Sequence, residues 1–179
     1  MLEELGRNYF ELFGIPKSFE IDNTQLTGRY HDLQRRFHPD KYANASDQER
    51  RLSMQVTAQI NEALQTLRDP VRRGRYLLML AGIEMNDETD TKMDPGFLME
   101  QMELREALAA VDTTSNPLAK LEEIMTEVDG GREVRLQKLS QLFSAGDDKA
   151  HSEIRKLLRE LQFLQKIYSE IEELEEVFI

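Results

Sequence analysis

Few residues in this chain of 179 residues are suited to chemistry, and the most distinctive group is His38-Pro39-Asp40. The chain contains three histidines and no cysteine, which excludes disulfides, thiolate nucleophiles and cysteine-ligated metal or iron–sulfur centres. It also lacks a Gly-rich phosphate loop and a G-x-S-x-G motif, so neither a nucleotide site nor a hydrolase is predicted. The open question is whether this tripeptide only ends a helix or forms a functional loop.

The residues before the tripeptide predict a basic amphipathic helix. Apolar side chains recur at helical spacing, at Leu26, Tyr30, Leu33 and Phe37. Arg29, Arg35 and Arg36 lie off that stripe. Pro39 disfavours helical geometry at His38, so the helix is expected to end there. Helix termination is one interpretation of the motif. A functional loop is the other, favoured by the basic helix before it and the apolar helix after it.

The whole chain predicts an all-α protein with two helical domains. The first domain, 1–82, is expected to contain a helical hairpin, and the second, 96–179, an antiparallel three-helix bundle. Polar residues 83–95 predict a linker between them. Expected helices cover 9–13, 22 or 23 to 37, 46 or 47 to 67, 70–81, about 95–111, 118–143 and about 149–177.

The predicted middle helix of the bundle contains Gly130-Gly131, which could divide it. Apolar residues keep one helical phase on both sides of the glycines, from Leu121 and Val128 to Leu136 and Leu139. Two separate helices would have no reason to stay in phase. We therefore predict one helix, weakened where each glycine costs about 1 kcal/mol relative to alanine.

Charge is distributed unevenly between the two predicted domains. Residues 1–81 hold 12 Lys or Arg and 11 Asp or Glu, whereas residues 82–179 hold 11 and 23, within a total net charge of −11. An acidic chain without a long basic face is a poor nucleic-acid binder. No stretch reaches the roughly 18 apolar residues of a membrane-spanning helix, and the first residues do not form a signal peptide. A cytoplasmic protein that binds neither membrane nor nucleic acid is expected.

The first helix of the second domain has a second apolar face. Phe97, Leu104 and Leu108 share one side, as a bundle helix requires, whereas Leu98, Met99 and Met102 lie roughly 100° or more away. Phe163 and Ile167 likewise fall off the apolar seam of the last helix. One explanation is packing against the first domain or a neighbouring helix. The other is an exposed surface for a partner, for which methionine is well suited.

The chain resembles the J-domain co-chaperones of Hsp70, and within them the HscB-type (Jac-type) co-chaperones of iron–sulfur cluster assembly. The short helix, basic helix, His-Pro-Asp loop and long antiparallel helix match a J-domain over about residues 6–81. The stretches that resemble the HscB branch span most of the chain: NYFELFGIP, LQRRFHPDKY, INEALQTLRDPVRRGRYLL and FLMEQMELREAL.

The resemblance implies a protein without catalytic residues, metal or cofactor, which activates the ATPase of a specialised Hsp70 (HscA-type). Its loop and basic helix would bind the Hsp70, with Asp40 pairing with a partner arginine. Arg35 and Arg36 could also be merely a solvated face. The residues implied in Hsp70 binding are Arg29, Tyr30, Arg35, Arg36, His38, Pro39, Asp40 and Lys41.

The resemblance also implies that the second domain binds the iron–sulfur scaffold protein (IscU-type) and delivers it to the Hsp70, which promotes cluster maturation and transfer. The positions implied in scaffold binding are Leu98, Met99, Met102, Glu103, Glu106, Phe163 and Ile167. Two rival functions remain. A J-protein for unfolded clients would usually carry a Gly/Phe-rich linker or zinc modules, which are missing. A helical metalloenzyme built on Glu100, Glu103 and His151 would lack the expected Glu-x-x-His pairs.

Overall fold

The computed structural model describes residues 1–85 and 94–178 of the chain. Helices make up nearly all of these residues and none of them forms a strand, so the predicted all-α class is confirmed. The chain divides into two compact units, Met1–Gly82 and Ile83–Ile179, which we call the first and second units. Most of the predicted linker at 83–95 lies outside the described residues. None of the described helices is long and apolar enough to cross a membrane.

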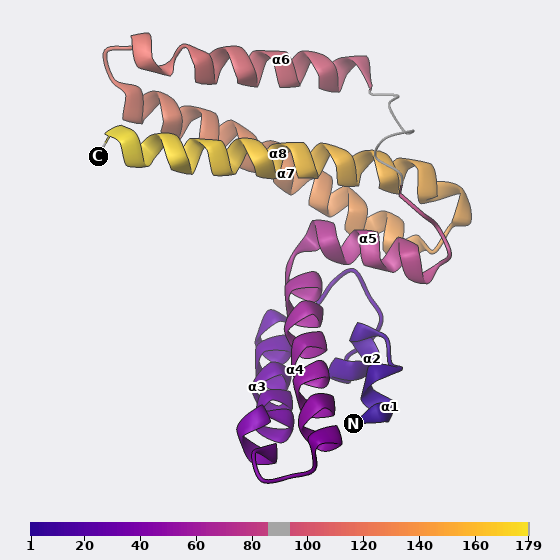
Figure 1. Cartoon of the computed structure of the whole chain (residues 1–179). Helices are drawn as coiled ribbons and strands as arrows, with labels where there is room; N and C mark the ends of the chain where they lie inside the picture. The colour runs from indigo at the N-terminus through magenta and orange to yellow at the C-terminus, as the bar shows by residue number, and fades with distance from the viewer. Residues whose placement is uncertain (86–93, 179) are drawn as a thin grey trace. The chain divides into compact units, whose positions relative to one another are not determined.

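The first unit is built around two long antiparallel helices, α3 and α4, joined by the loop that contains His38 (Figure 1). A short helix at the start of the chain, α1, was not predicted. The helices are α1 (Leu2–Leu5), α2 (Tyr9–Phe13), α3 (Asn23–Phe37), the 3-10 turn η1 (Pro39–Tyr42), α4 (Asp47–Arg68) and α5 (Pro70–Leu80).

Local sequence signals set the ends of these helices. The Asp22 carboxylate accepts hydrogen bonds from the first turn of α3, and Ser46 forms a reciprocal capping box with Glu49 at the start of α4. Gly14 ends α2 with a φ of 62°, a left-handed conformation that glycine adopts at little cost. Each of these ends follows from residues adjacent in sequence.

The core of the first unit joins α2, α3, α4 and α5. Its fully buried side chains include Phe10, Leu26, Phe37 and Ile60. The Tyr76 ring of α5 stacks on Tyr9, with 4.4 Å between ring centres, and its hydroxyl accepts a 2.9 Å hydrogen bond from the Tyr9 backbone N–H. Because α3 and α4 are packed along this core, the ends that carry the His38 loop are held together.

The second unit consists of three helices that run antiparallel in succession (Figure 1). The middle helix is continuous through Gly130-Gly131, as the apolar phase predicted. The elements are α6 (Pro95–Ala109), the 3-10 turn η2 (Val111–Thr113), α7 (Pro117–Ala145), the 3-10 turn η3 (Asp148–Ala150) and α8 (His151–Phe178).

The buried side of α6 is the predicted one, but the buried side of α8 is wider than predicted. Phe97, Leu104 and Leu108 of α6 are buried. On α8 the seam residues Leu161, Leu164 and Ile171 are joined in the core by Ile167, which is 0% exposed. The prediction that Ile167 lies off the packing face is wrong. A strict coiled-coil seam is narrower than the apolar face of a helix that packs in a bundle.

Candidate functional site

The His38 loop has a defined conformation that its own residues impose. The N–H of His38 closes the last turn of α3 on the Gln34 carbonyl, and ψ of His38 is then 130°, away from helical geometry as Pro39 requires. The imidazole Nδ1 accepts a 3.3 Å hydrogen bond from the Asp40 backbone N–H. The imidazole thus caps the 3-10 turn.

Two further hydrogen bonds attach the loop to the hairpin. The Tyr42 hydroxyl donates to the Arg36 carbonyl at 3.4 Å, and the Thr57 hydroxyl of α4 donates to the Phe37 carbonyl at 3.1 Å. The side chain of His38 is 50% exposed and that of Asp40 is 91% exposed. The loop is therefore anchored by the Tyr42 side chain and by the end of α3, while the imidazole and the carboxylate remain accessible.

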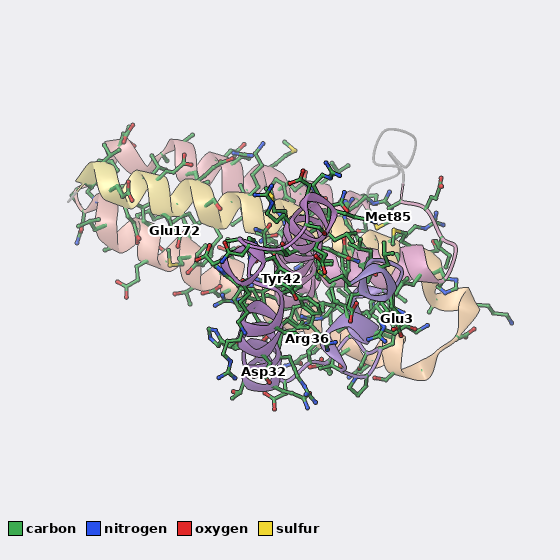
Figure 2. The ribbon with its side chains drawn as sticks, turned by 60° about the horizontal axis from the view of Figure 1, so that its bottom comes forward. Glu3, Asp32, Arg36, Tyr42, Met85 and Glu172 are labelled. Atoms are coloured by element: carbon green, nitrogen blue, oxygen red, sulfur yellow. The ribbon has the colours of Figure 1, made fainter. Side chains whose placement is uncertain are left out.

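The basic residues beside the loop fall into two groups. Arg29, Arg35 and Lys41 are exposed, although Arg35 forms an ion pair with Asp32. Arg36 is held more closely, with its guanidinium 4.8 Å from the centre of the Phe37 ring and 3.5 Å from the Glu4 carboxylate. Figure 2 brings this end of the first unit forward, with Asp32, Arg36 and Tyr42 labelled. Together these residues place positive charge around the loop.

Tyr30 is placed differently from the other residues predicted to bind Hsp70. It is half-buried between α3 and α4, where its hydroxyl donates to the Asn61 side chain at 3.2 Å. The Gln34 amide donates to the same Asn61 oxygen at 2.8 Å and to the Tyr30 hydroxyl at 3.2 Å. Tyr30 therefore has a clear structural role in the hairpin, while its contact with a partner stays a prediction.

The second surface is an apolar patch on α6, made by Leu98, Met99 and Met102, which we call the α6 patch. These residues are 43%, 63% and 63% exposed, and they lie roughly 100° or more around the helix from the buried Phe97. Glu103 and Glu106 are also exposed and flank the patch. The other helices of the second unit thus leave the α6 patch exposed. Adjacent exposed apolar residues of this kind usually mark an interaction site.

Phe163 extends this region onto α8, and Ile167 does not. The Phe163 ring is half-buried and meets Phe97 edge-on, with 5.6 Å between ring centres, while the Arg105 guanidinium lies 5.7 Å from its centre. Ile167, one turn further along α8, has no exposed area to offer a partner. Its predicted direct contact with a scaffold is therefore corrected to a supporting position in the core.

A partly buried charged cluster beneath α6 was not predicted from the sequence. The Arg135 guanidinium of α7 donates to Glu160 of α8 at 2.7 Å, to Glu100 of α6 at 2.6 Å and to the Gly131 carbonyl at 3.0 Å. Burial lowers the pKa of Arg135, but its hydrogen bonds to Glu160 and Glu100 outweigh burial and raise the pKa above its usual value. The polar residues seemed unremarkable in sequence because each could equally have pointed into solvent.

The metalloenzyme alternative gains no support from the geometry. Among the described residues, no three His, Asp or Glu side chains are grouped in a way that could hold a metal ion. Glu100, one of the ligands considered, is instead bound to Arg135. The same side chain cannot readily serve both purposes, because a cation beside the guanidinium would be repelled by it.

Comparison with known proteins gives consistent matches for both units. Residues 8–76 match the family model of the DnaJ domain, and residues 93–172 match the model described as the HSCB C-terminal oligomerisation domain. The chain is 42% identical to a co-chaperone protein HscB homolog of Shewanella baltica, over 96% of this chain and 99% of that one. It is 45% identical to a Vibrio cholerae homolog, over 94% and 97% of the two chains.

Solved structures agree with these matches. The chaperone HscB from Vibrio cholerae superposes with a TM-score of 0.86 at 43% identity, covering 97% of this chain and all of the other. Human co-chaperone protein HscB gives a TM-score of 0.87 at 33% identity, covering 97% and 84%. The yeast Jac1 co-chaperone, at 22% identity and a TM-score of 0.71, shares the fold.

Proposed function

Because the chain belongs to the HscB family of J-domain co-chaperones, we propose that it stimulates ATP hydrolysis by a specialised Hsp70 and delivers the iron–sulfur scaffold protein to it. The chain supplies no catalytic group in this proposal. Each partner has its own surface. The His38 loop binds the Hsp70, and the α6 patch binds the scaffold. The scaffold carries the iron–sulfur cluster as cargo, and this chain, without cysteine, does not ligate it.

The observation that carries the proposal is the pre-set, exposed His38 loop. Its backbone is fixed by Pro39 and by the Asp40 N–H bond to the His38 imidazole. A rigid loop loses little conformational entropy when it docks, so its hydrogen bonds contribute more fully to binding. The exposed Asp40 carboxylate suits an arginine of the Hsp70, because a carboxylate and a guanidinium form strong charge-assisted hydrogen bonds.

The charges around the loop support a partner with an acidic face. Arg29, Arg35 and Lys41 are exposed, whereas residues 82–179 carry most of the chain's Asp and Glu residues. Rim charges of this kind act mainly on the association rate. We expect stimulation at low Hsp70 concentration to fall as salt is raised, because screening weakens attraction between exposed charges.

For the scaffold, the α6 patch offers an apolar centre with an acidic border. Met99 and Met102 can adapt to a partner surface, and Phe163 provides a more rigid aromatic contact beside them. The acidic Glu103 and Glu106 suit basic residues on the scaffold. When one chain holds both partners, each is present at a high local concentration for the other, which favours loading of the scaffold onto the Hsp70.

The test is ATP turnover by the cognate specialised Hsp70 with this protein, the scaffold, or both. We expect strong synergy from the pair, which His38→Gln abolishes. The matched control is His31→Gln, which makes the same change at an exposed position of α3 outside the loop and should leave synergy intact. No stimulation by the unaltered protein would reject the co-chaperone mechanism. Stimulation that the scaffold does not increase would reject delivery by the second unit.

A second candidate role for the α6 patch is self-association, because the matched family model is described as an oligomerisation domain. Two copies could bury Met99 and Met102 against each other. Sedimentation of the protein at increasing concentration, alone and with the Met99→Ala/Met102→Ala double variant, tests this role. A dimer that dissociates in the double variant would favour it over scaffold binding.

A further inference from the structure

We propose that Arg135 is a positioning residue for scaffold binding, which fixes α6 on the other two helices and thereby sets the α6 patch in its binding arrangement. This inference rests on the proposed function, since it concerns the same surface. Arg135 itself is only 14% exposed and lies on α7, so its role is to support the patch from behind.

The guanidinium of Arg135 connects all three helices of the second unit. It forms ion pairs with Glu100 of α6 and Glu160 of α8, and it donates to the Gly131 carbonyl of its own helix. Its centre also lies 5.2 Å from the centre of the Phe97 ring of α6. Lysine would replace it only in part, because a single ammonium group keeps the charge but lacks the planar set of donors that reaches separate acceptors.

Buried apolar side chains anchor the first half of α6 less than the second half. Between Pro95 and Glu103, Phe97 is the only buried side chain, whereas Leu104 and Leu108 anchor the second half. One further attachment is Asp94, the N-cap of α6, which binds Lys156 of α8 at 3.1 Å. The patch residues Leu98, Met99 and Met102 all lie between Pro95 and Glu103. The ion pair of Glu100 with Arg135 lies among them and therefore helps to set their position relative to α8.

Gly131 makes room for this arrangement. A Cβ atom at Gly131 would lie 3.1 Å from the Arg135 Nη1 and 3.5 Å from the Glu100 carboxylate. At the neighbouring Gly130, a Cβ would meet nothing within 4 Å. The glycine pair in the middle of α7 thus has unequal members, and the one at 131 lets the guanidinium approach the helix backbone closely.

The same cluster reaches the aromatic part of the docking surface. The Arg135 guanidinium lies over the Phe97 ring, and the Phe97 ring in turn meets the Phe163 ring of α8 edge-on. Phe163 is partly exposed. Loss of Arg135 would remove the guanidinium that binds both Glu100 and Glu160, and would leave Glu160 with the longer ion pair to Lys156 at 3.9 Å. Like charges in a partly buried site repel. Separation of α6 from α8 would then move Met99 and Phe163 apart, and a partner would have to re-form the surface when it binds.

The experiment compares Arg135→Leu, Arg135→Lys and Glu160→Gln in the full chain with the control Arg132→Leu. Arg132 lies on the same helix, and its side chain, 41% exposed, pairs only weakly with Asp129 at 4.0 Å. Scaffold affinity is measured by calorimetry at a temperature where circular dichroism shows each variant folded. We expect Arg135→Leu to weaken scaffold binding about tenfold or more, with smaller losses for Arg135→Lys and Glu160→Gln, and Arg132→Leu to stay within about twofold.

A second measurement separates positioning from general loss of stability. Methyl resonances of Met99 and Met102 should shift or broaden in Arg135→Leu, while those of Met125 in the bundle core and Met54 in the first unit keep their positions. Hsp70 stimulation without scaffold should be unchanged. Glu160→Gln removes the negative charge of one of the two ion pairs of Arg135 but keeps a neutral acceptor that favours folding, so it supplies the test should Arg135→Leu not fold.

The possible outcomes are distinct. The positioning role would be overturned if Arg135→Leu binds the scaffold with the same affinity as the Arg132→Leu control. If Arg135→Leu does not fold, the same comparison is made with Glu160→Gln. Equal shifts of Met99 and Met125 would also overturn it, because they would indicate general unfolding. If the unaltered protein itself does not bind the scaffold, the proposed function fails, and that result is read before any variant is compared.

Discussion

The His38 loop and the α6 patch are both exposed, but different kinds of contact hold them in place. The loop is ordered mainly by neighbours in sequence, since the Asp40 N–H bonds to His38 and the Tyr42 hydroxyl bonds to the Arg36 carbonyl. The patch is ordered by residues far away in sequence, because Glu100 of α6 is bound to Arg135 of α7 and Phe97 meets Phe163 of α8. The comparison shows that one binding surface is locally encoded and the other depends on packing.

The two surfaces should therefore respond differently to substitutions in the core. A locally ordered loop should keep its conformation when the core beneath it is perturbed, whereas a surface held by three helices should not. The polar character of the loop and the apolar character of the patch also separate their partners. In the proposed function we expect the loop to bind through charge and hydrogen bonds, and the patch through burial of Met and aromatic side chains.

The largest effect is expected from the core beneath α6. Leu104→Ala removes a side chain that is 2% exposed and should cost about 2–5 kcal/mol of stability in the second unit. Scaffold binding should fall sharply, while Hsp70 stimulation without scaffold is retained. Hydrogen exchange resolved by unit is the suitable measurement, because two units need not unfold in one transition. Equal loss of protection in both units would contradict the expected independence.

A crossed pair of surface variants is expected to give the next largest effect. Asp40→Asn should abolish Hsp70 stimulation and leave scaffold affinity unchanged. Met99→Ala/Met102→Ala should weaken scaffold binding by about 2–3 kcal/mol and leave stimulation without scaffold unchanged. Calorimetry with the scaffold and ATP turnover by the Hsp70 measure the two effects. Loss of both activities in either variant would break the assignment of one surface to each partner.

Thr57→Val tests how far the loop depends on tertiary contact. The substitution removes the hydroxyl that donates to the Phe37 carbonyl and should cost about 1 kcal/mol. Because the other loop bonds are local, stimulation of the Hsp70 should fall only slightly. Thermal unfolding and ATP turnover are measured together, with Thr27→Val, on the exposed side of α3, as the control. Abolished stimulation in a folded Thr57→Val protein would show that the loop is not locally encoded.

The two glycines of α7 provide a matched pair. Gly130→Ala should stabilise the second unit by about 1 kcal/mol, since its Cβ enters open space and alanine favours a helix. Gly131→Ala should gain less or nothing, because its Cβ lies 3.1 Å from Arg135 Nη1. Denaturant unfolding of both variants measures the difference. Equal gains would mean that Arg135 adjusts without cost.

The smallest effect concerns pH at the start of α6. The hydrogen bond from Lys156 and those from the Gly96 and Phe97 backbone lower the pKa of Asp94 below its usual value. A lowered pKa means that the ionised carboxylate stabilises the folded state above the unfolded pKa of about 3.9, and that this contribution is lost as pH falls through the folded value. The stability difference between the unaltered protein and Asp94→Asn should therefore be present near neutrality and shrink in acid. A difference that grows toward low pH would refute this interpretation.

Much of the fold was predictable because its signals are local. The helix ends follow from Asp22, Ser46 and Gly14, and the exposed α6 patch follows from the angular positions of Met99 and Met102 around their own helix. Continuity through Gly130-Gly131 was likewise encoded in the phase of the apolar residues. The short helix α1 was missed, since four residues carry too little periodicity to be recognised.

The sequence by itself determined the helices other than α1, the His38 loop and which side of α6 carries the exposed methionines. Tertiary structure alone decided that Ile167 is buried, that Tyr30 bonds to Asn61, and that Arg135 binds both Glu100 and Glu160. The physical reason is that periodicity reports the direction of a side chain around its own helix axis. The width of the buried face, and the charges that meet across it, depend on how neighbouring helices pack.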